Sequence, residues 1–359
     1  MMRVTLLALL AAGCTTVPLA SGPPPPRLAS RVPAALPAPP EAPGSITLSA
    51  EPITVEDNWL LHLYTALHPR NYRAFRVEFT GADGAPSTAH FLVPDAPGPH
   101  PAVLVFPITG GDHVVSEALA KALVHRGYAV LRVERREFFP EEEEPDFDLT
   151  LPAERLRVSL LDARRLIGWL GTRPEIDAQR LASAGVSLGG ILAASLMGLD
   201  DRIQAGFFIM AGGGLPELMH DSREGPLRRL RERIFRHNGD RSREGFIAFA
   251  RAHTEDVDPL TYARHIDPER ALLISGRFDR AVPPPRTRAL WEAMGYPTWH
   301  IVPVGHYQIA PFFWWCVGRG ADHLDRVFAA PGRDERDAAS THVERVRQDP
   351  GAPRIVDAQ

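Results

Sequence analysis

The 359-residue chain is poor in cysteine and lacks several patterns that would assign it to a defined chemistry. It holds only two cysteines, Cys14 and Cys316, so no disulfide framework is available. Its fourteen histidines occur without H-E-x-x-H or paired C-x-x-C spacing, and no G-x-x-x-x-G-K-[ST] loop is present. The sequence therefore indicates neither a metal site nor a nucleotide-phosphate site, and we expect no cofactor.

Net charge and hydropathy argue against two further classes of protein, those that bind nucleic acid and those that span a membrane. The formal net charge is −4, so no basic field favours nucleic acid as a partner. No apolar run approaches the roughly 18 residues that a membrane-spanning helix needs. Hydrophobic residues make up 44% of the chain, and residues 45–330 are enough for one large domain with a sizeable core.

The segment RLASAGVSLGG, residues 180–190, predicts a serine on a sharp turn between a strand and a helix. The apolar stretch before Gly185 suits a short buried strand, and GILAASLMGL after the turn suits a helix. A G-x-S-x-G turn needs small residues around its serine because the backbone is strained and its neighbours crowd the helix. An ordinary tight turn would have the same residues, but the partners downstream favour Ser187 as a nucleophile.

Two downstream residues supply the groups that a nucleophilic serine needs. Asp279 follows the apolar run 271–275 on a loop marked by three prolines, and His306 follows the run 298–304. A serine hydroxyl is a poor nucleophile at neutral pH, so an imidazole must take its proton and a carboxylate must orient that imidazole. We therefore predict that Ser187, His306 and Asp279 act together.

Backbone N–H groups should hold the oxyanion that forms during such a reaction. The N–H of Leu188, directly after the serine, is one expected donor. The second should follow the strand 101–106, and Thr109 or Ile108 is the expected residue. The pair Gly110-Gly111 would let a substrate carbonyl approach the backbone, although the same pair also occurs in ordinary turns between a strand and a helix.

These segments resemble the α/β-hydrolase superfamily, with GVSLGG, GRFDRAVPP and PVGHYQ in family order. The resemblance covers roughly residues 75–330, and within it the short apolar strands and the proline-marked acid loop are similar to the esterase and dienelactone-hydrolase-like branches. It implies an α/β fold, with a mostly parallel central sheet flanked by helices and a helical lid insertion. One departure concerns the oxyanion loop, where Pro107-Ile108 stands in place of the His-Gly that many members carry.

The pattern of apolar residues agrees with an alternation of strands and helices. The early runs 75–80 and 88–93 flank a Gly-Ala-Asp-Gly turn and predict an antiparallel hairpin. The other predicted elements are helices over 114–126 and 153–170, and strands over 128–133 and 203–210. The acidic run Glu141–Glu144 is expected in an exposed loop, and Cys316 is expected to be buried by packing in an apolar helix.

Residues 212–268 are more than a simple crossover needs, so we expect a lid there. Within this insertion, residues 227–237 (LRRLRERIFRH) have a helical pattern rich in arginine. Such a helix could contact anionic lipid or an acidic substrate. The simpler interpretation, which we favour, is a solvated helix with internal ion pairs.

The N-terminus resembles a bacterial lipoprotein signal. Residues 1–13 combine one positive charge with the apolar stretch VTLLALLAA, and Leu10-Ala11-Ala12-Gly13-Cys14 resembles a lipobox. The resemblance implies lipidation of Cys14, and an ordinary secretory signal is the alternative. Residues 14–44 include ten prolines after the cysteine and predict an extended tether. The polar tail 331–359 is expected to pack weakly.

The sequence thus predicts a serine hydrolase that cleaves carboxylic esters through an acyl-enzyme. The lipobox implies export across the inner membrane to the bacterial cell envelope, with membrane attachment at Cys14. The expected partner is a small-molecule ester. A non-catalytic envelope binding protein on the same fold is an alternative, as is an acyltransferase or peptidase with the same residues, and spacing does not separate them. The sequence makes no prediction about the oligomeric state.

Overall fold

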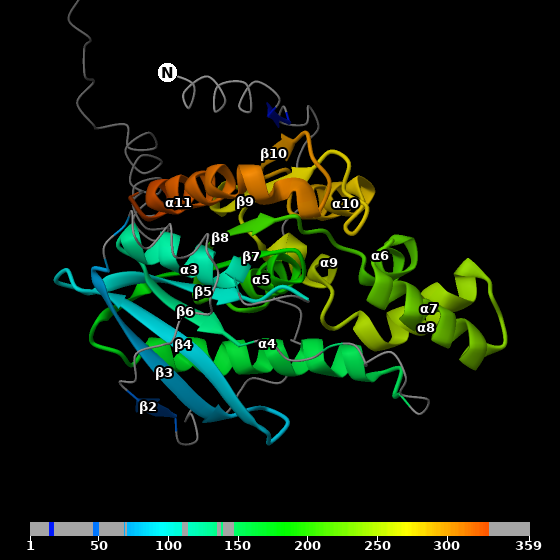
Figure 1. The fold of residues 1–359 in the computed structure, drawn as a ribbon, viewed down its shortest axis with the longest axis horizontal. Helices are drawn as coiled ribbons and strands as arrows, with labels where there is room; N and C mark the ends of the chain where they lie inside the picture. Colours follow the sequence, from blue (N-terminus) through cyan, green and yellow to red (C-terminus); the bar gives the residue numbers. More distant parts are fainter. Residues whose placement is uncertain are drawn as a thin grey trace, which may run out of the picture.

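The computed structural model describes residues 14–17, 46–49, 68, 70–109, 114–134, 138 and 147–329. The predicted signal 1–13, most of the predicted tether, the run Glu141–Glu144 and the tail 331–359 lie outside the described residues. The described part is built on one ten-stranded sheet with helices on both faces (Figure 1). Because strand and helix alternate along most of the chain, the central strands run parallel.

The sheet has the strand order β1-β10-β9-β8-β7-β5-β6-β4-β3-β2. The strands from β10 to β6 in this order are parallel, and β4, β3 and β2 at one edge and β1 at the other are antiparallel. The strand bounds are β1 Thr15–Thr16, β2 Thr47–Ser49, β3 Tyr72–Thr80, β4 Pro86–Pro94, β5 His100–Phe106, β6 Ala129–Val133, β7 Ile176–Val186, β8 Ile203–Ile209, β9 Ala271–Gly276 and β10 Thr298–Val302.

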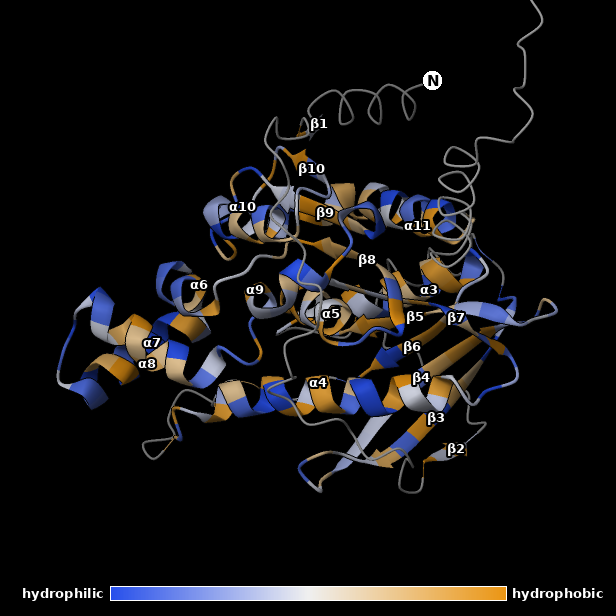
Figure 2. Cartoon of the chain, turned by 180° about the vertical axis from the view of Figure 1, so that it is seen from behind, coloured by the Kyte–Doolittle hydropathy of each residue, from blue (hydrophilic) through white to orange (hydrophobic). Residues whose placement is uncertain are grey.

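The helices cover the two faces of the sheet separately. Helices α4, α5 and α10 contribute to one hydrophobic core, whereas α3 and α11 contribute to the other. Figure 2 shows hydrophobic residues concentrated in the strands and on parts of the flanking helices. The bounds of these helices are α3 Val114–His125, α4 Leu151–Leu170, α5 Leu188–Leu199, α10 Pro284–Ala293 and α11 Phe313–Ala329.

Local sequence explains the burial of the strands. All residues of β6 and β9 are buried, as expected for parallel strands covered by helices on both faces. In contrast, β3 alternates buried and more exposed residues, because it lies toward an antiparallel edge with one face toward water. The predicted hairpin and the predicted parallel strands are confirmed, with boundaries shifted by a few residues.

The first described residues of the predicted tether pair with the edge of the sheet. Residues 15 and 16 pair antiparallel with Ile301 and His300 of β10, and the Val17 N–H donates to the Trp299 carbonyl at 2.9 Å. Cys14 packs half-buried against the core that includes α11. The edge of β10 offers unpaired backbone groups, and this short strand satisfies some of them. The proline pattern gave no signal of this pairing.

The segment between β8 and β9 forms a helical insertion with its own small core. Leu230, Ile234 and Phe235 pack there with Phe246 and Ala250. Figure 1 shows this insertion projecting to one side of the sheet. Across the described ranges, no helix combines the length and apolar character needed to cross a bilayer. The helices of the insertion are α6 Leu215–Asp221, α7 Gly225–Asn238, α8 Arg243–Thr254 and α9 Pro259–Tyr262.

The buried histidine of α11 should make stability depend on pH. Burial lowers the pKa of His323 to about 4, so this side chain stays neutral in the folded protein at pH 5. The unfolded chain binds a proton below its ordinary pKa near 6.5, so folding stability should fall as pH drops from 6.5 toward 4. Between pH 7.5 and 5.0, wild type should lose about 2 kcal/mol more than His323→Leu in urea unfolding. Equal losses in the two proteins would contradict this account.

Candidate active site

Ser187 occupies the turn between β7 and α5. Strand β7 ends at Val186, helix α5 begins at Leu188, and Ser187 lies between them with φ 57° and ψ −125°. A positive φ is unfavourable for a residue with a Cβ, and such strain persists only where neighbouring contacts enforce it. Here the Ser187 N–H donates to the Ile209 carbonyl at 2.8 Å, and its carbonyl accepts from the Ile191 N–H at 3.0 Å.

The glycines beside Ser187 allow the turn to pack closely against the sheet. A Cβ on Gly189 would lie 2.5 Å from the carbonyl oxygen of Phe106 and 2.8 Å from that of Pro107. A Cβ on Gly185 would meet the backbone of Gly189 itself. The end of β5 therefore lies directly against the start of α5, and this contact requires glycine at 189. Glycine at 185 lets the end of β7 approach the same turn of α5.

Gly189→Ala should lower stability and activity together. The added methyl meets backbone atoms, which cannot rotate away, so we expect a loss of about 1–3 kcal/mol in the free energy of unfolding. Separation of α5 from β5 should also disturb the site around Ser187. Gly318→Ala in α11 is the matched control, because its added Cβ would meet no atom within 4 Å. Urea unfolding of both variants measures the difference, and equal stabilities would contradict the predicted clash.

The structure brings His306 and Asp279 together with Ser187. The His306 Nε2 lies 2.9 Å from the Ser187 Oγ, and its Nδ1 lies 2.7 Å from the Asp279 Oδ2. Asp279 follows β9 and His306 follows β10, so both lie at the carboxyl ends of parallel strands, on the same side of the sheet as Ser187. Three residues separated by up to 119 positions thus form one hydrogen-bonded chain.

The carboxylate of Asp279 is fixed independently of the histidine. Its Oδ1 accepts the N–H groups of Ala281 and Val282 at 2.8 and 2.9 Å, and its side chain is buried. The other oxygen is left for the Nδ1–H of His306. A proton held on Nδ1 leaves the Nε2 lone pair directed at the serine hydroxyl, which is the tautomer that proton abstraction requires.

The expected oxyanion donors lie around the same turn. Leu188 is the first residue of α5, and the first N–H groups of a helix have no acceptor within the helix. Ile108 and Thr109 follow β5 and are half-buried, two and three residues beyond the Phe106 carbonyl that approaches Gly189. Residues 110–113 lie outside the described residues. The assignment of Thr109 or Ile108 as the second donor therefore stays a prediction.

Sequence reasoning missed the aromatic side chains at the rim of the site. Phe278 and Tyr307, neighbours of Asp279 and His306 in the chain, are 63% and 71% exposed. The hydroxyl of Tyr307 donates to the carboxylate of Glu224 in the helical insertion. Partial desolvation of the hydroxyl, together with this acidic partner, raises the pKa of Tyr307 to about 12. The position of Tyr307 directly after the predicted histidine was the sequence feature that could have pointed to it. That feature gives no indication of its distant partner, Glu224.

The loop that carries Asp279 makes a second contact with the insertion. The Arg223 N–H donates at 3.0 Å to the carbonyl of Arg280, the residue directly after Asp279 in the chain.

Within the part of the chain that the structure describes, no group of three or more His, Cys, Asp or Glu side chains is arranged to hold a metal ion. Cys316 is buried in α11, and burial raises the pKa of its thiol to about 12, so it is a packing residue.

Comparisons with known proteins identify the fold. No protein-family model matches this sequence, and no curated protein does. Among solved structures, acetyl xylan esterase 1 from Thermoanaerobacterium sp. JW/SL YS485 is similar, with a TM-score of 0.55 and 18% identity over 77% of this chain and 88% of its own. The acetyl xylan esterase from Paenibacillus sp. R4 has a TM-score of 0.55 and 18% identity over 76% and 87%. The sheet topology and these neighbours show that the chain has the α/β-hydrolase fold.

Proposed function

We propose that this protein is a serine hydrolase that cleaves carboxylic esters through an acyl-enzyme. The observation that carries the proposal is the chain of hydrogen bonds from Asp279 through His306 to the Ser187 Oγ. A strained turn holds the serine at the carboxyl end of a parallel strand, where open α/β sheets bind ligands. Fold alone does not assign an activity, so the proposal depends on this site.

Each residue has one role in the proposed reaction. His306 accepts the proton of Ser187 as the Oγ attacks the ester carbonyl carbon, and Asp279 stabilises the imidazolium that forms. The N–H of Leu188 and a donor at residue 108 or 109 hold the negative charge on the former carbonyl oxygen. His306 then protonates the leaving alcohol. In the second half, a water loses its proton to His306, attacks the acyl carbon and releases the acid, and Ser187 regains its proton.

Short acyl groups are the proposed first substrates, because two of the similar structures are acetyl xylan esterases. A series of 4-nitrophenyl esters from acetate to dodecanoate tests this part of the proposal. We expect the highest kcat/KM at two to four acyl carbons, with His306→Ala inactive across the series. Absence of hydrolysis with every ester would contradict the esterase assignment, and a maximum at long chains would contradict only the acyl preference.

The helical insertion is proposed to act as a lid over the site. Two contacts support this role: the hydrogen bond between Tyr307 and Glu224, and the backbone hydrogen bond between Arg223 and Arg280. Both join the turn between α6 and α7 to loops that carry Asp279 or His306. A cover at this place would limit the access of water to the acyl-enzyme.

We also propose that the chain is a lipoprotein of the bacterial envelope, attached through Cys14. The lipobox-like segment before Cys14 supports this proposal. Because residues 15 and 16 pair with β10, the lipid would lie close to the edge of the sheet and to α11. Metabolic labelling with an alkyne fatty acid should mark wild type, and Cys14→Ala should remove the label. A label that persists in Cys14→Ala would contradict the assignment.

A further inference from the structure

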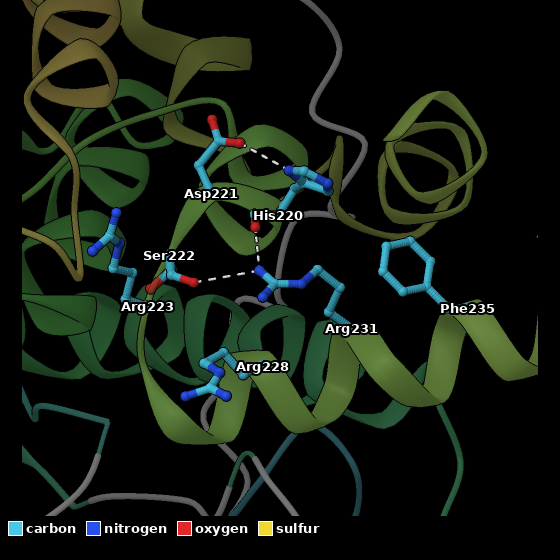
Figure 3. A pocket seen from close by; sticks show the side chains of 7 residues that line it. All are labelled: His220, Asp221, Ser222, Arg223, Arg228, Arg231 and Phe235. Atoms are coloured by element: carbon cyan, nitrogen blue, oxygen red, sulfur yellow. Dashed lines mark hydrogen bonds and ion pairs between the residues drawn. The ribbon is translucent and has the colours of Figure 1, made fainter. Parts of the chain in front are cut away.

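A cavity of about 540 Å³ lies in the helical insertion, beside the proposed lid contacts. It is formed where α6 ends and α7 begins, and Figure 3 shows the side chains that surround it. Its lining combines three arginines with one aspartate, a histidine, a serine and the ring of Phe235: His220, Asp221, Ser222, Arg223, Arg228, Arg231 and Phe235. A hollow of this size is large enough for a small ligand group.

The charges around the cavity are not balanced within the described part of the chain. Asp221, its one carboxylate, lies 2.9 Å from the His220 Nδ1 and 3.4 Å from the guanidinium of Arg243, which is outside the lining. Neither Arg223 nor Arg228 has a carboxylate partner among the described residues. The cavity therefore presents two guanidinium groups that remain able to bind an anion.

The third arginine fixes the shape of the cavity. The guanidinium of Arg231 donates to the carbonyl of His220 and, at 3.4 Å, to that of Ser222 (Figure 3). These bonds tie α7 to the turn that carries Arg223. The Ser222 Oγ accepts the N–H of Glu224 at 3.3 Å, which orders the same turn further. The other two arginines thus extend from a backbone that is held in place.

The turn that carries Arg223 also forms hydrogen bonds with the loops of the candidate active site. Glu224 lies between Arg223 and Arg228 in the chain, and its carboxylate accepts the hydroxyl of Tyr307, next to His306. The partner of Glu224 is therefore at the active-site rim. On the other side, the Arg223 N–H binds the carbonyl of Arg280, next to Asp279. The turn that carries Arg223 therefore contacts both loops that hold the histidine and the aspartate of the candidate site.

We propose that this cavity is an anion-binding subsite, in which Arg223 and Arg228 bind a carboxylate or phosphate group carried by the ester substrate. The inference rests on the proposed esterase function and narrows its substrate class to esters that bear a second, anionic group. Two guanidinium groups match the planar oxygens of a carboxylate or the oxygens of a phosphate. Arg231 acts as a positioning residue, because its contacts are with backbone carbonyls.

A binding measurement tests the subsite without any turnover. Citrate and inorganic pyrophosphate are titrated by calorimetry into the full chain carrying Ser187→Ala, in low salt. We expect saturable binding that Arg228→Gln weakens about 10-fold, because one charge-assisted contact is lost. Arg236→Gln is the matched control: it removes the same charge from the same helix, at an exposed position outside the cavity, and should leave binding unchanged.

A kinetic measurement tests whether the subsite belongs to the substrate. For a charge on the acyl side, kcat/KM for 4-nitrophenyl hemisuccinate is divided by kcat/KM for the uncharged 4-nitrophenyl pentanoate. For a charge on the alcohol side, kcat/KM for acetyl glycerol 3-phosphate is divided by kcat/KM for triacetin. In at least one pair, wild type should favour the anionic ester, and Arg228→Gln or Arg223→Gln should lower the ratio about 10-fold through KM. Raised ionic strength should lower the ratio as well.

The outcomes separate the two proposals. Ester cleavage with ratios that Arg228→Gln does not change, together with anion binding that does not depend on Arg228, would overturn the subsite and leave the esterase in place. Anion binding that depends on Arg228, without cleavage of any ester, would retain an anion site but remove the proposed function. Binding only to vesicles of anionic phospholipid, with none to citrate or pyrophosphate, would overturn the substrate assignment and indicate a membrane contact instead.

Discussion

Ser187→Ala is expected to lower turnover of esters by about 10³-fold or more while the protein stays folded. The alanine keeps the Cβ and the backbone of the turn, so the packing of α5 against β5 should survive. What is lost is the oxygen that lies 2.9 Å from the His306 Nε2 and that is proposed to attack the ester. The residual rate should come from the remaining groups and from substrate binding, as is general for serine hydrolases.

The measurement is kcat on 4-nitrophenyl acetate with circular dichroism on the same samples. Ser159→Ala is a suitable control, because Ser159 donates to the Arg155 carbonyl within α4 and lies outside the candidate site. It should keep the activity of wild type. Comparable rates in wild type and Ser187→Ala would remove the serine from the mechanism.

Asp279→Asn should have the second large effect, a loss of about 10⁴-fold in kcat with a small change in KM. The amide oxygen of asparagine can still accept the N–H groups of Ala281 and Val282, so the loop should keep its shape. Its NH₂ group would then face the His306 Nδ1 and favour the tautomer with the proton on Nε2. That proton would block abstraction from the Ser187 hydroxyl.

Steady-state kinetics near neutral pH measure this loss, and thermal unfolding shows whether the loop is intact. Asp267→Asn provides a control at another loop aspartate, whose carboxylate caps a short helix by accepting the Glu269 N–H. It should leave kcat near that of wild type. A fall in kcat of less than about 10-fold in Asp279→Asn would show that this carboxylate does not orient the histidine.

Much of the fold follows from local patterns. The strands around β5 and β9 are apolar runs bounded by turn residues, and covered parallel strands have this composition. The turn at Ser187 could be predicted from the sequence because its strain and close packing require glycines at 185 and 189. The order of Ser187, Asp279 and His306 was readable for a related reason, since each follows a strand and parallel strands end at one edge.

The remaining features depend on contacts between segments far apart in the sequence. The pairing of residues 15 and 16 with β10 joins positions 284 or more apart, and no periodicity marks it. The bond between Tyr307 and Glu224 and the cavity beside Arg223 arise from how the insertion folds back on the domain. The packing of distant segments determines such contacts. The sequence alone shows only which of the residues involved are charged.

The most direct test of the account is covalent labelling of the intact protein with a fluorophosphonate, followed by peptide mass mapping. An activated serine attacks phosphorus and displaces fluoride, whereas an ordinary hydroxyl reacts too slowly to be marked. We expect one label, on the peptide that contains Ser187, absent in Ser187→Ala and strongly reduced in His306→Ala. No label, or a label on another residue that persists in Ser187→Ala, would contradict it.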